Sequence, residues 1–317
     1  MVLKVFEQPQ SPVTMEQELD VLILGAGWTA TFLIPLLGER NMTFAATTSD
    51  GRHVAGSQTL KWRFDPTAPD PEQTKAFSLL PRARHVLITF PLKGKGQSAV
   101  LTSAYKQTHG GDGAGTGTFR FIQLGSTGIW QQDPEQAPWL DRRSPYKADD
   151  QRAVAEDELL GLGGCVLNLA GLWGGERDMR NWVDRVATTK EAVKGKTSLH
   201  MVHGVDVARV IAGVIQAGRG GKDSDSSSSG WDSVGRGQRW MVTDGFVYDW
   251  WSLFASWSSI GEDGSKPTKQ AKWVYELMQE GGVRALPRSM EALGRCYDTR
   301  ELWQTLSITP LKAGLGL

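Results

Sequence analysis

A short glycine-rich segment near the start of this 317-residue chain has the spacing of a phosphate-binding turn. It reads GAGWTA over residues 25–30, a GxGxxA pattern that follows the apolar run VLIL and opens a helical pattern. The first glycine permits a tight bend, the second lets the backbone approach a pyrophosphate, and the small third residue lets the helix pack on the strand. The helix N-terminus adds free N–H groups. The segment therefore predicts dinucleotide binding, with a purely structural turn as the alternative, and the candidate cofactor residues here are Gly25, Gly27, Trp28, Thr29 and Ala30.

The choice of cofactor depends on the end of the second predicted strand, where NAD-binding proteins offer an acidic residue to the ribose. Here the strand ends in hydroxyl residues, with Thr48 among them, and Arg52 follows closely. A hydroxyl group and an arginine suit a 2′-phosphate, so the sequence favours NADP over NAD. In the alternative interpretation Asp50 binds the ribose and Arg52 is a solvated turn residue.

The elements that position these residues follow from an alternation of apolar runs and helix-length stretches. Five β-rich runs indicate a parallel sheet buried on both faces, with a helix over 97–109 and a sixth strand at 239–245. The predicted fold is α/β, a Rossmann-type doubly wound parallel sheet with a small, mainly helical C-terminal cap. The five runs lie at 21–27, 42–49, 85–91, 119–126 and 165–171.

We expect four parts along the chain. Residues 1–19 are a polar, flexible lead-in and residues 20–217 the NAD(P)-binding core. Residues 218–238 form a Ser/Gly loop that we expect to be disordered, and residues 239–317 hold the last strand and a substrate cap.

Composition excludes several classes of partner. The 35 basic and 35 acidic residues cancel, so no overall field favours nucleic acid or an anionic membrane. The two cysteines and five histidines show no metal-ligand spacing, and we expect no metal site. The uncharged stretch 21–37 is interrupted by glycines and by Pro35, and nothing before it resembles a signal peptide, so we expect a cytoplasmic protein without a membrane span. The partner we expect is a small-molecule substrate, and the oligomeric state stays open.

Five motifs taken in order resemble the extended short-chain dehydrogenase/reductases, above all the atypical branch of NAD(P)-dependent epimerase/dehydratase-like proteins. They are LILGAGW, VLITFP, LGSTGIW, LNLAGLWGGER and MVHGVDVARVI, and they cover about residues 20–217. The resemblance implies that Phe90 and Pro91 pass over the cofactor and that Ser126 hydrogen-bonds the substrate oxygen. His203 and Asp206 match a segment that ties the substrate domain to the core, and we favour a structural role for both.

The chain departs from this family at the catalytic pair, a tyrosine with a lysine four residues later. The residue four positions after each of the five tyrosines is never lysine. The corresponding segment aligns with Ala148 at the tyrosine position and Arg152 at the lysine position, and Tyr146 lies two residues away. The candidate catalytic residues are therefore Ser126, Tyr146 and Arg152, with Tyr146 or a bound water as proton donor.

Three functions stay open. The first is an atypical NADP(H)-binding oxidoreductase or epimerase-like enzyme acting on a small carbonyl or hydroxyl compound, which we favour. The second is a non-catalytic dinucleotide-binding sensor or scaffold. The third is an isomerase or lyase derived from the same fold, in which the nucleotide is only structural.

Overall fold

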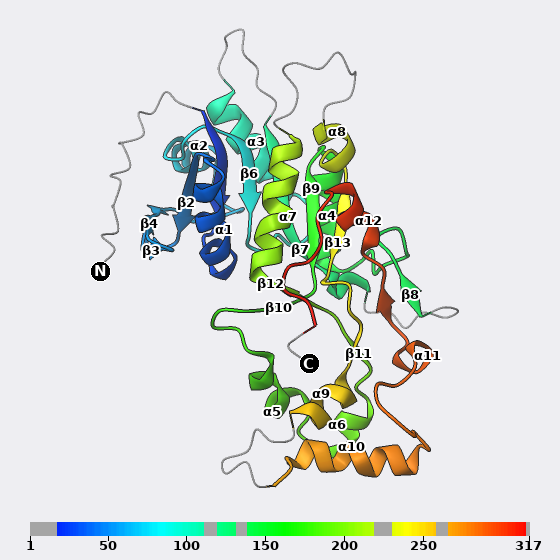
Figure 1. Ribbon diagram of the computed structural model, residues 1–317. Coiled ribbons are helices and arrows are strands. Elements are labelled where there is room, and N and C mark those ends of the chain that lie inside the picture. Colours follow the sequence, from blue (N-terminus) through cyan, green and yellow to red (C-terminus); the bar gives the residue numbers. More distant parts are fainter. Residues whose placement is uncertain (1–17, 111–118, 131–137, 219–229, 258–265, 315–317) are drawn as a thin grey trace, which may run out of the picture.

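The computed structural model describes residues 18–110, 119–130, 138–218, 230–257 and 266–314 (Figure 1). A seven-stranded sheet forms its centre, with strand order β13-β9-β7-β6-β1-β2-β5 and every neighbouring pair parallel. Its strands are β1 (Leu19–Leu24), β2 (Phe44–Thr48), β5 (Leu60–Lys61), β6 (Ala83–Ile88), β7 (Arg120–Ser126), β9 (Cys165–Leu169) and β13 (Arg239–Val242).

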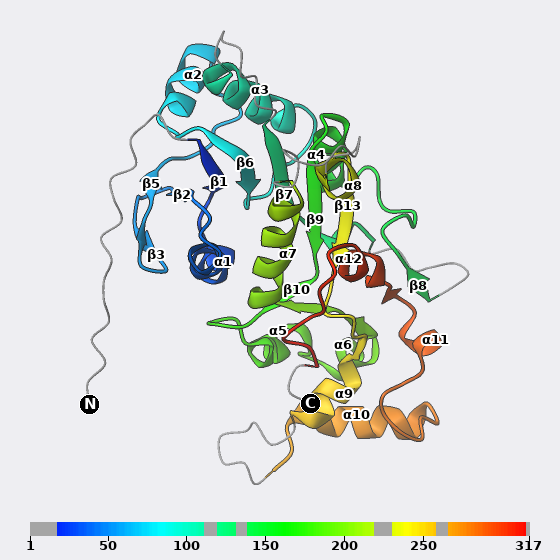
Figure 2. The same cartoon turned by 45° about the horizontal axis from the view of Figure 1, so that its top comes forward.

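Helices cover both faces of this sheet, which explains why the strands are apolar without strict alternation. Along β1, Val21 and Ile23 face a core shared with α1 (Trp28–Glu39) and α7 (Gly204–Ala217). Leu22 faces the other core, shared with α2 (Asp70–Ser78), α3 (Gln97–His109) and α4 (Gln151–Gly161). Figure 2 shows α1 and α7 on one side of the sheet and α2 and α3 on the other.

The strand order reverses between β1 and β6, because the chain runs outward from β1 first to β2 and later to β6. In doubly wound sheets a crevice opens at this point, beyond the carboxyl ends of the strands, and ligands bind there. The GAGWTA turn connects β1 to α1 and therefore borders the crevice.

A smaller cap with its own apolar core lies beyond the carboxyl ends of the strands (Figure 1). Tryptophans dominate this core, and Trp250 and Trp251 are both buried in it. The cap also takes Met179, Ala187 and Val193 from the stretch assigned to the nucleotide-binding core, so it is built from two separated parts of the chain. Its elements are α5 (Val183–Val186), α6 (Lys190–Lys194), β11 (Ser198–Leu199), β14 (Tyr248–Asp249), α9 (Trp250–Ser256), α10 (Lys269–Glu280) and α11 (Met290–Leu293).

The remaining short elements join or flank these two parts. The parallel pair β10–β12 leads from the core into the cap, and the parallel pair β8–β15 lies beside it. The full set of these short elements is β3 (His53–Val54), β4 (Ser57–Gln58), η1 (Thr127–Trp130), β8 (Trp139–Leu140), β10 (Gly171–Trp173), η2 (Met179–Trp182), β12 (Met201–His203), α8 (Gly230–Val234), β15 (Cys296–Tyr297) and α12 (Arg300–Thr305).

The α/β class, the parallel sheet and the helix over 97–109 are confirmed. The loop predicted to reach residue 238 ends earlier, because α8 forms within it and buries Trp231 against the core. Residues 1–17 and 219–229, on which the flexible lead-in and most of that loop were predicted, lie outside the described residues. The stretch 21–37 is divided between β1 and α1, and no helix among the described residues has the length and apolar character needed to cross a membrane.

Candidate functional site

The turn after β1 is held by the neighbouring strand. Thr47, in β2, accepts the Gly25 N–H on its Oγ1 at 3.0 Å and the Ala26 N–H on its carbonyl oxygen at 2.6 Å. Gly25 has φ +88°, and a Cβ there would stand 2.9 Å from the Thr89 Oγ1. Only glycine fits this backbone and this close approach.

The N-terminus of α1 is open to an anion. Gly27 is the N-cap, no side chain caps the helix, and its first turn contains no acidic residue. Gly27 is exposed, and a Cβ on it would meet nothing closer than the Gly25 oxygen at 3.9 Å. Ala30 is 1% exposed and packs into the core below. Free helical N–H groups beside an open glycine are the donor set that a pyrophosphate needs, so these residues fit the dinucleotide that the fold implies.

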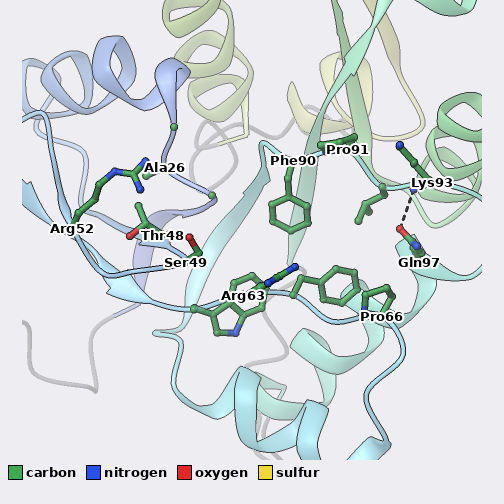
Figure 3. Close-up of a pocket in the computed structure, with 15 residues that line it drawn as sticks. Ala26, Thr48, Ser49, Arg52, Arg63, Pro66, Phe90, Pro91, Lys93 and Gln97 are labelled. Carbon is green, nitrogen blue, oxygen red and sulfur yellow. Dashed lines mark hydrogen bonds between the residues drawn. The ribbon is translucent and has the colours of Figure 1, made fainter.

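A cavity of about 660 Å³ extends from this turn along the end of β2 (Figure 3). Thr48, Arg52, Phe90 and Pro91 all line it, as do Gly25 and Gly27. The Arg52 guanidinium also donates to Asp50 at 3.0 Å, in an exposed ion pair. Phe90 forms part of an aromatic wall that suits a flat base.

Sequence reasoning missed three residues of this cavity, which follow the edge strand β5. Arg63 is the second arginine of the cavity and is drawn near Phe90 in Figure 3. Trp62 and Phe64 add two rings, and Phe64 stacks on Phe90 with ring centroids 6.1 Å apart. The only signal in the sequence was the basic and aromatic run KWRF, which has no strand-like length. The residues are Trp62, Arg63 and Phe64.

A second cavity, of about 390 Å³, lies on the other side of the turn and brings Ser126 and Arg152 together. Ser126 ends β7, and its Oγ accepts the N–H of Gly128 at 3.1 Å. Arg152 lies in the first turn of α4, and the Asp150 side chain, the N-cap, accepts the Arg152 backbone N–H. Trp28 and Thr29 of the turn line the same cavity.

Tyr146 does not line this cavity. Its hydroxyl donates to Asp157 at 2.7 Å, and its ring lies under the Arg239 guanidinium, 4.4 Å from the ring centroid. Burial and the bond to Asp157 raise the pKa of Tyr146. The structure thus places Ser126 and Arg152 in one cavity and directs the tyrosine hydroxyl to a different partner.

A buried carboxylate lies directly behind Ser126. Five acidic residues between 149 and 158 have the pattern of a solvated helix face, but Glu156 is 0% exposed. Asn168 donates from Nδ2 to Glu156 at 2.8 Å and to the Ser126 carbonyl at 3.1 Å, and Arg239 reaches Glu156 at 3.2 Å. A Cβ on Gly125 would collide with this carboxylate. Desolvation raises the pKa of Glu156 to about 6.

The two residues expected to be structural have structural contacts. His203 is the N-cap of α7, and its Nδ1 accepts the Val205 N–H at 3.1 Å. Asp206 is fully buried and accepts the backbone N–H groups of Leu311 and Lys312 at 2.7 and 2.8 Å. These contacts join the core to the C-terminal segment.

No protein-family model matches the chain, and no curated protein matches it either. Solved structures do. The chain is similar to the UDP-glucose 4-epimerase of Thermotoga maritima, solved with UDP-glucose, at 14% identity and a TM-score of 0.55, covering 92% of this chain and 94% of that one. It is also similar to the UDP-glucose 4-epimerase of Thermus thermophilus in complex with NAD, at 14% identity and a TM-score of 0.54, covering 93% of this chain and 95% of that one. A third similar structure is the Bordetella bronchiseptica enzyme WbmG in complex with NAD, at 12% identity and a TM-score of 0.53, covering 95% of this chain and 91% of that one.

These similarities are to the fold and extend over more than nine-tenths of the chain. They confirm the fold that the motifs predicted, because the chain shares the Rossmann-type fold of these solved structures. Two of the similar structures, those from Thermus thermophilus and Bordetella bronchiseptica, are complexes with NAD.

Proposed function

We propose that the protein is an NADP(H)-dependent oxidoreductase or epimerase-like enzyme acting in the cytoplasm on a small carbonyl or hydroxyl compound. The observation that carries the proposal is the continuity of the site. The glycine turn borders both cavities, one lined by arginines that suit a phosphate and the other by Ser126 and Arg152.

The cofactor lies, in this proposal, across the turn. The N–H groups at the start of α1 bind the pyrophosphate, and the aromatic wall at Phe90 contacts the adenine. Arg52 and Arg63 supply the positive charge that a 2′-phosphate requires, and Thr48 supplies a hydroxyl. Asp50, the alternative ribose ligand, does not line this cavity. These contacts favour NADP over NAD.

At the other end of the site the protein's own residues orient the substrate oxygen. A nicotinamide bound here would supply or accept the hydride at the substrate carbon, and a proton would move to or from the oxygen. Ser126 donates a hydrogen bond to that oxygen, and Arg152 stabilises the negative charge that develops on it. Glu156 and Asn168 act through the backbone, because Asn168 holds the Ser126 carbonyl.

The proton source differs from that of enzymes with a tyrosine and lysine pair. A bound water is supported over Tyr146, because the Tyr146 hydroxyl already donates to Asp157 and its ring does not line the cavity. General acid catalysis contributes about 10²–10⁴-fold, so a site that uses water in place of a tuned tyrosine should turn over slowly.

The missing pair also favours a second candidate, a non-catalytic sensor that binds the same nucleotide. NADPH oxidation across a panel of aldehydes and ketones distinguishes the two, with the Ser126→Ala variant as control. The enzyme is supported when turnover is measurable and falls at least tenfold in Ser126→Ala while the Kd for NADPH stays within twofold. No turnover on any carbonyl, together with a rise in melting temperature on adding NADPH, supports the sensor.

A further inference from the structure

The cavity beside Ser126 carries positive charge and no negative charge. Two arginines line it, Arg152 from α4 and Arg177 from the loop after β10, and none of its lining residues is acidic. Within the described ranges neither guanidinium forms an ion pair, whereas nearby Arg180 is paired with Asp178 at 2.5 Å and the buried Arg239 with Glu156. Unpaired guanidinium groups in a cavity attract carboxylates and phosphates.

Arg177 is held in place before any ligand binds. Its guanidinium lies over the ring of Trp28, 4.5 Å from the centroid. The loop that carries it is closed by two backbone hydrogen bonds between Gly174 and Arg177, and Trp28 donates from Nε1 to the Gly174 oxygen at 3.0 Å. Such stacking fixes an arginine without neutralising it.

Arg177 is also the residue at which two cavities meet. On the cap side it lines a further cavity of about 440 Å³, together with the Asp178–Arg180 ion pair and the side chains of Trp173, Met179 and Trp257. The two charges of the ion pair neutralise each other, and the two tryptophan rings and the methionine suit a flat or apolar group. A ligand that spans both cavities would have its acidic group at Arg177 and its apolar part in the cap.

We propose that Arg177 selects the substrate by binding the carboxylate of an aromatic or apolar oxo acid, whose carbonyl then faces Ser126. This inference rests on the proposed function and specifies its substrate class. The cofactor pyrophosphate does not require Arg177, because the open N-terminus of α1 offers its own donors.

The test is calorimetry on the full chain saturated with NADP⁺, in which no hydride is available and the probe is not consumed. The probes are phenylpyruvate and its uncharged ethyl ester. We expect the acid to bind at least tenfold more tightly than the ester. The Arg177→Met variant should weaken binding of the acid at least tenfold, leave the ester unchanged and keep the Kd for NADP⁺ within twofold.

Two further variants make the test specific. Arg177→Lys should restore part of the affinity, because it keeps the charge without the planar fork. Arg185→Met is the control, because Arg185 is exposed in α5 and lines neither cavity, and it should leave binding of the acid unchanged.

The inference is overturned if NADP⁺ binds and the acid does not, if the ester binds as tightly as the acid, or if Arg177→Met weakens NADP⁺ as much as it weakens the acid. Failure of NADP⁺ itself to bind contradicts the proposed function first, so the two failures are distinguishable.

Discussion

Replacing Gly27 with alanine should abolish tight nucleotide binding while leaving the apoprotein folded. Gly27 has a negative φ of −99°, and an added Cβ would stand 3.9 Å from the Gly25 oxygen, which is an ordinary contact distance. The cost to the fold is limited to a poorer N-cap, about 1 kcal/mol or less. The methyl group would nevertheless stand in both cavities, where a diphosphate has to approach the backbone.

The expected loss of affinity follows from the hydrogen bonds involved. A hydrogen bond to a charged group contributes about 1.5–3 kcal/mol, and moving the pyrophosphate away from α1 weakens at least one of them. Since about 1.4 kcal/mol is a factor of ten, the Kd for NADPH should rise roughly 10- to 100-fold.

Gly25→Ala is the matched comparison, because here the fold itself should suffer. A positive φ costs a residue with a Cβ about 1–2 kcal/mol, and the crowding against Thr89 and Phe90 costs about 1–3 kcal/mol more. Calorimetric titration with NADPH and thermal unfolding without nucleotide measure the two effects separately. Unchanged NADPH affinity in Gly27→Ala would refute the placement of the pyrophosphate, and a Gly25→Ala variant as stable as the parent would refute the account of the turn.

Three other changes test different parts of the molecule. Arg63→Met should raise the Kd for NADPH about tenfold and keep the Kd for NADH within twofold, because only NADPH loses a charged hydrogen bond to its 2′-phosphate. An equal rise in the Kd for NADPH and for NADH would exclude a contact between Arg63 and the 2′-phosphate. Tyr146→Phe should keep kcat within about twofold and lower the free energy of unfolding by about 1 kcal/mol through loss of the bond to Asp157; a collapse of kcat would make Tyr146 the proton donor after all. His200 is 4% exposed, its Nε2 accepts the Tyr297 N–H at 3.1 Å, and burial lowers its pKa from 6.5 to about 3. The unfolded chain therefore takes up the proton first, and the contribution of this histidine to stability, complete above about pH 6.5, is lost as the pH falls. Urea unfolding at pH 7 and pH 5 should show the parent losing about 2 kcal/mol more than His200→Gln, whereas parallel losses would contradict a neutral buried histidine.

The parts of the fold that local sequence determines were predictable. Strands buried on both faces are mostly apolar, and the turn after β1 needs glycine at fixed positions, so both are visible in a single sequence. Residues 97–109 form the predicted helix because their side chains suit it locally and its ends are marked by glycines.

What escaped prediction depends on contacts between distant segments. Arg63 reaches the site because the two-residue strand β5 pairs with β2, and two residues carry no period. Glu156, in helix α4, is buried because Gly125 of β7 leaves room for its carboxylate, to which Asn168 and Arg239 donate hydrogen bonds. The importance of Arg177 likewise comes from Trp28, far away in the sequence.

A crystal structure with NADPH bound tests the central claim most directly. We predict the pyrophosphate at the N–H groups of residues 28 and 29, the 2′-phosphate between Arg52 and Arg63, and the nicotinamide in the cavity lined by Ser126 and Arg152. A crevice still empty at saturating NADPH, or a nicotinamide directed to solvent away from Ser126, would contradict the account.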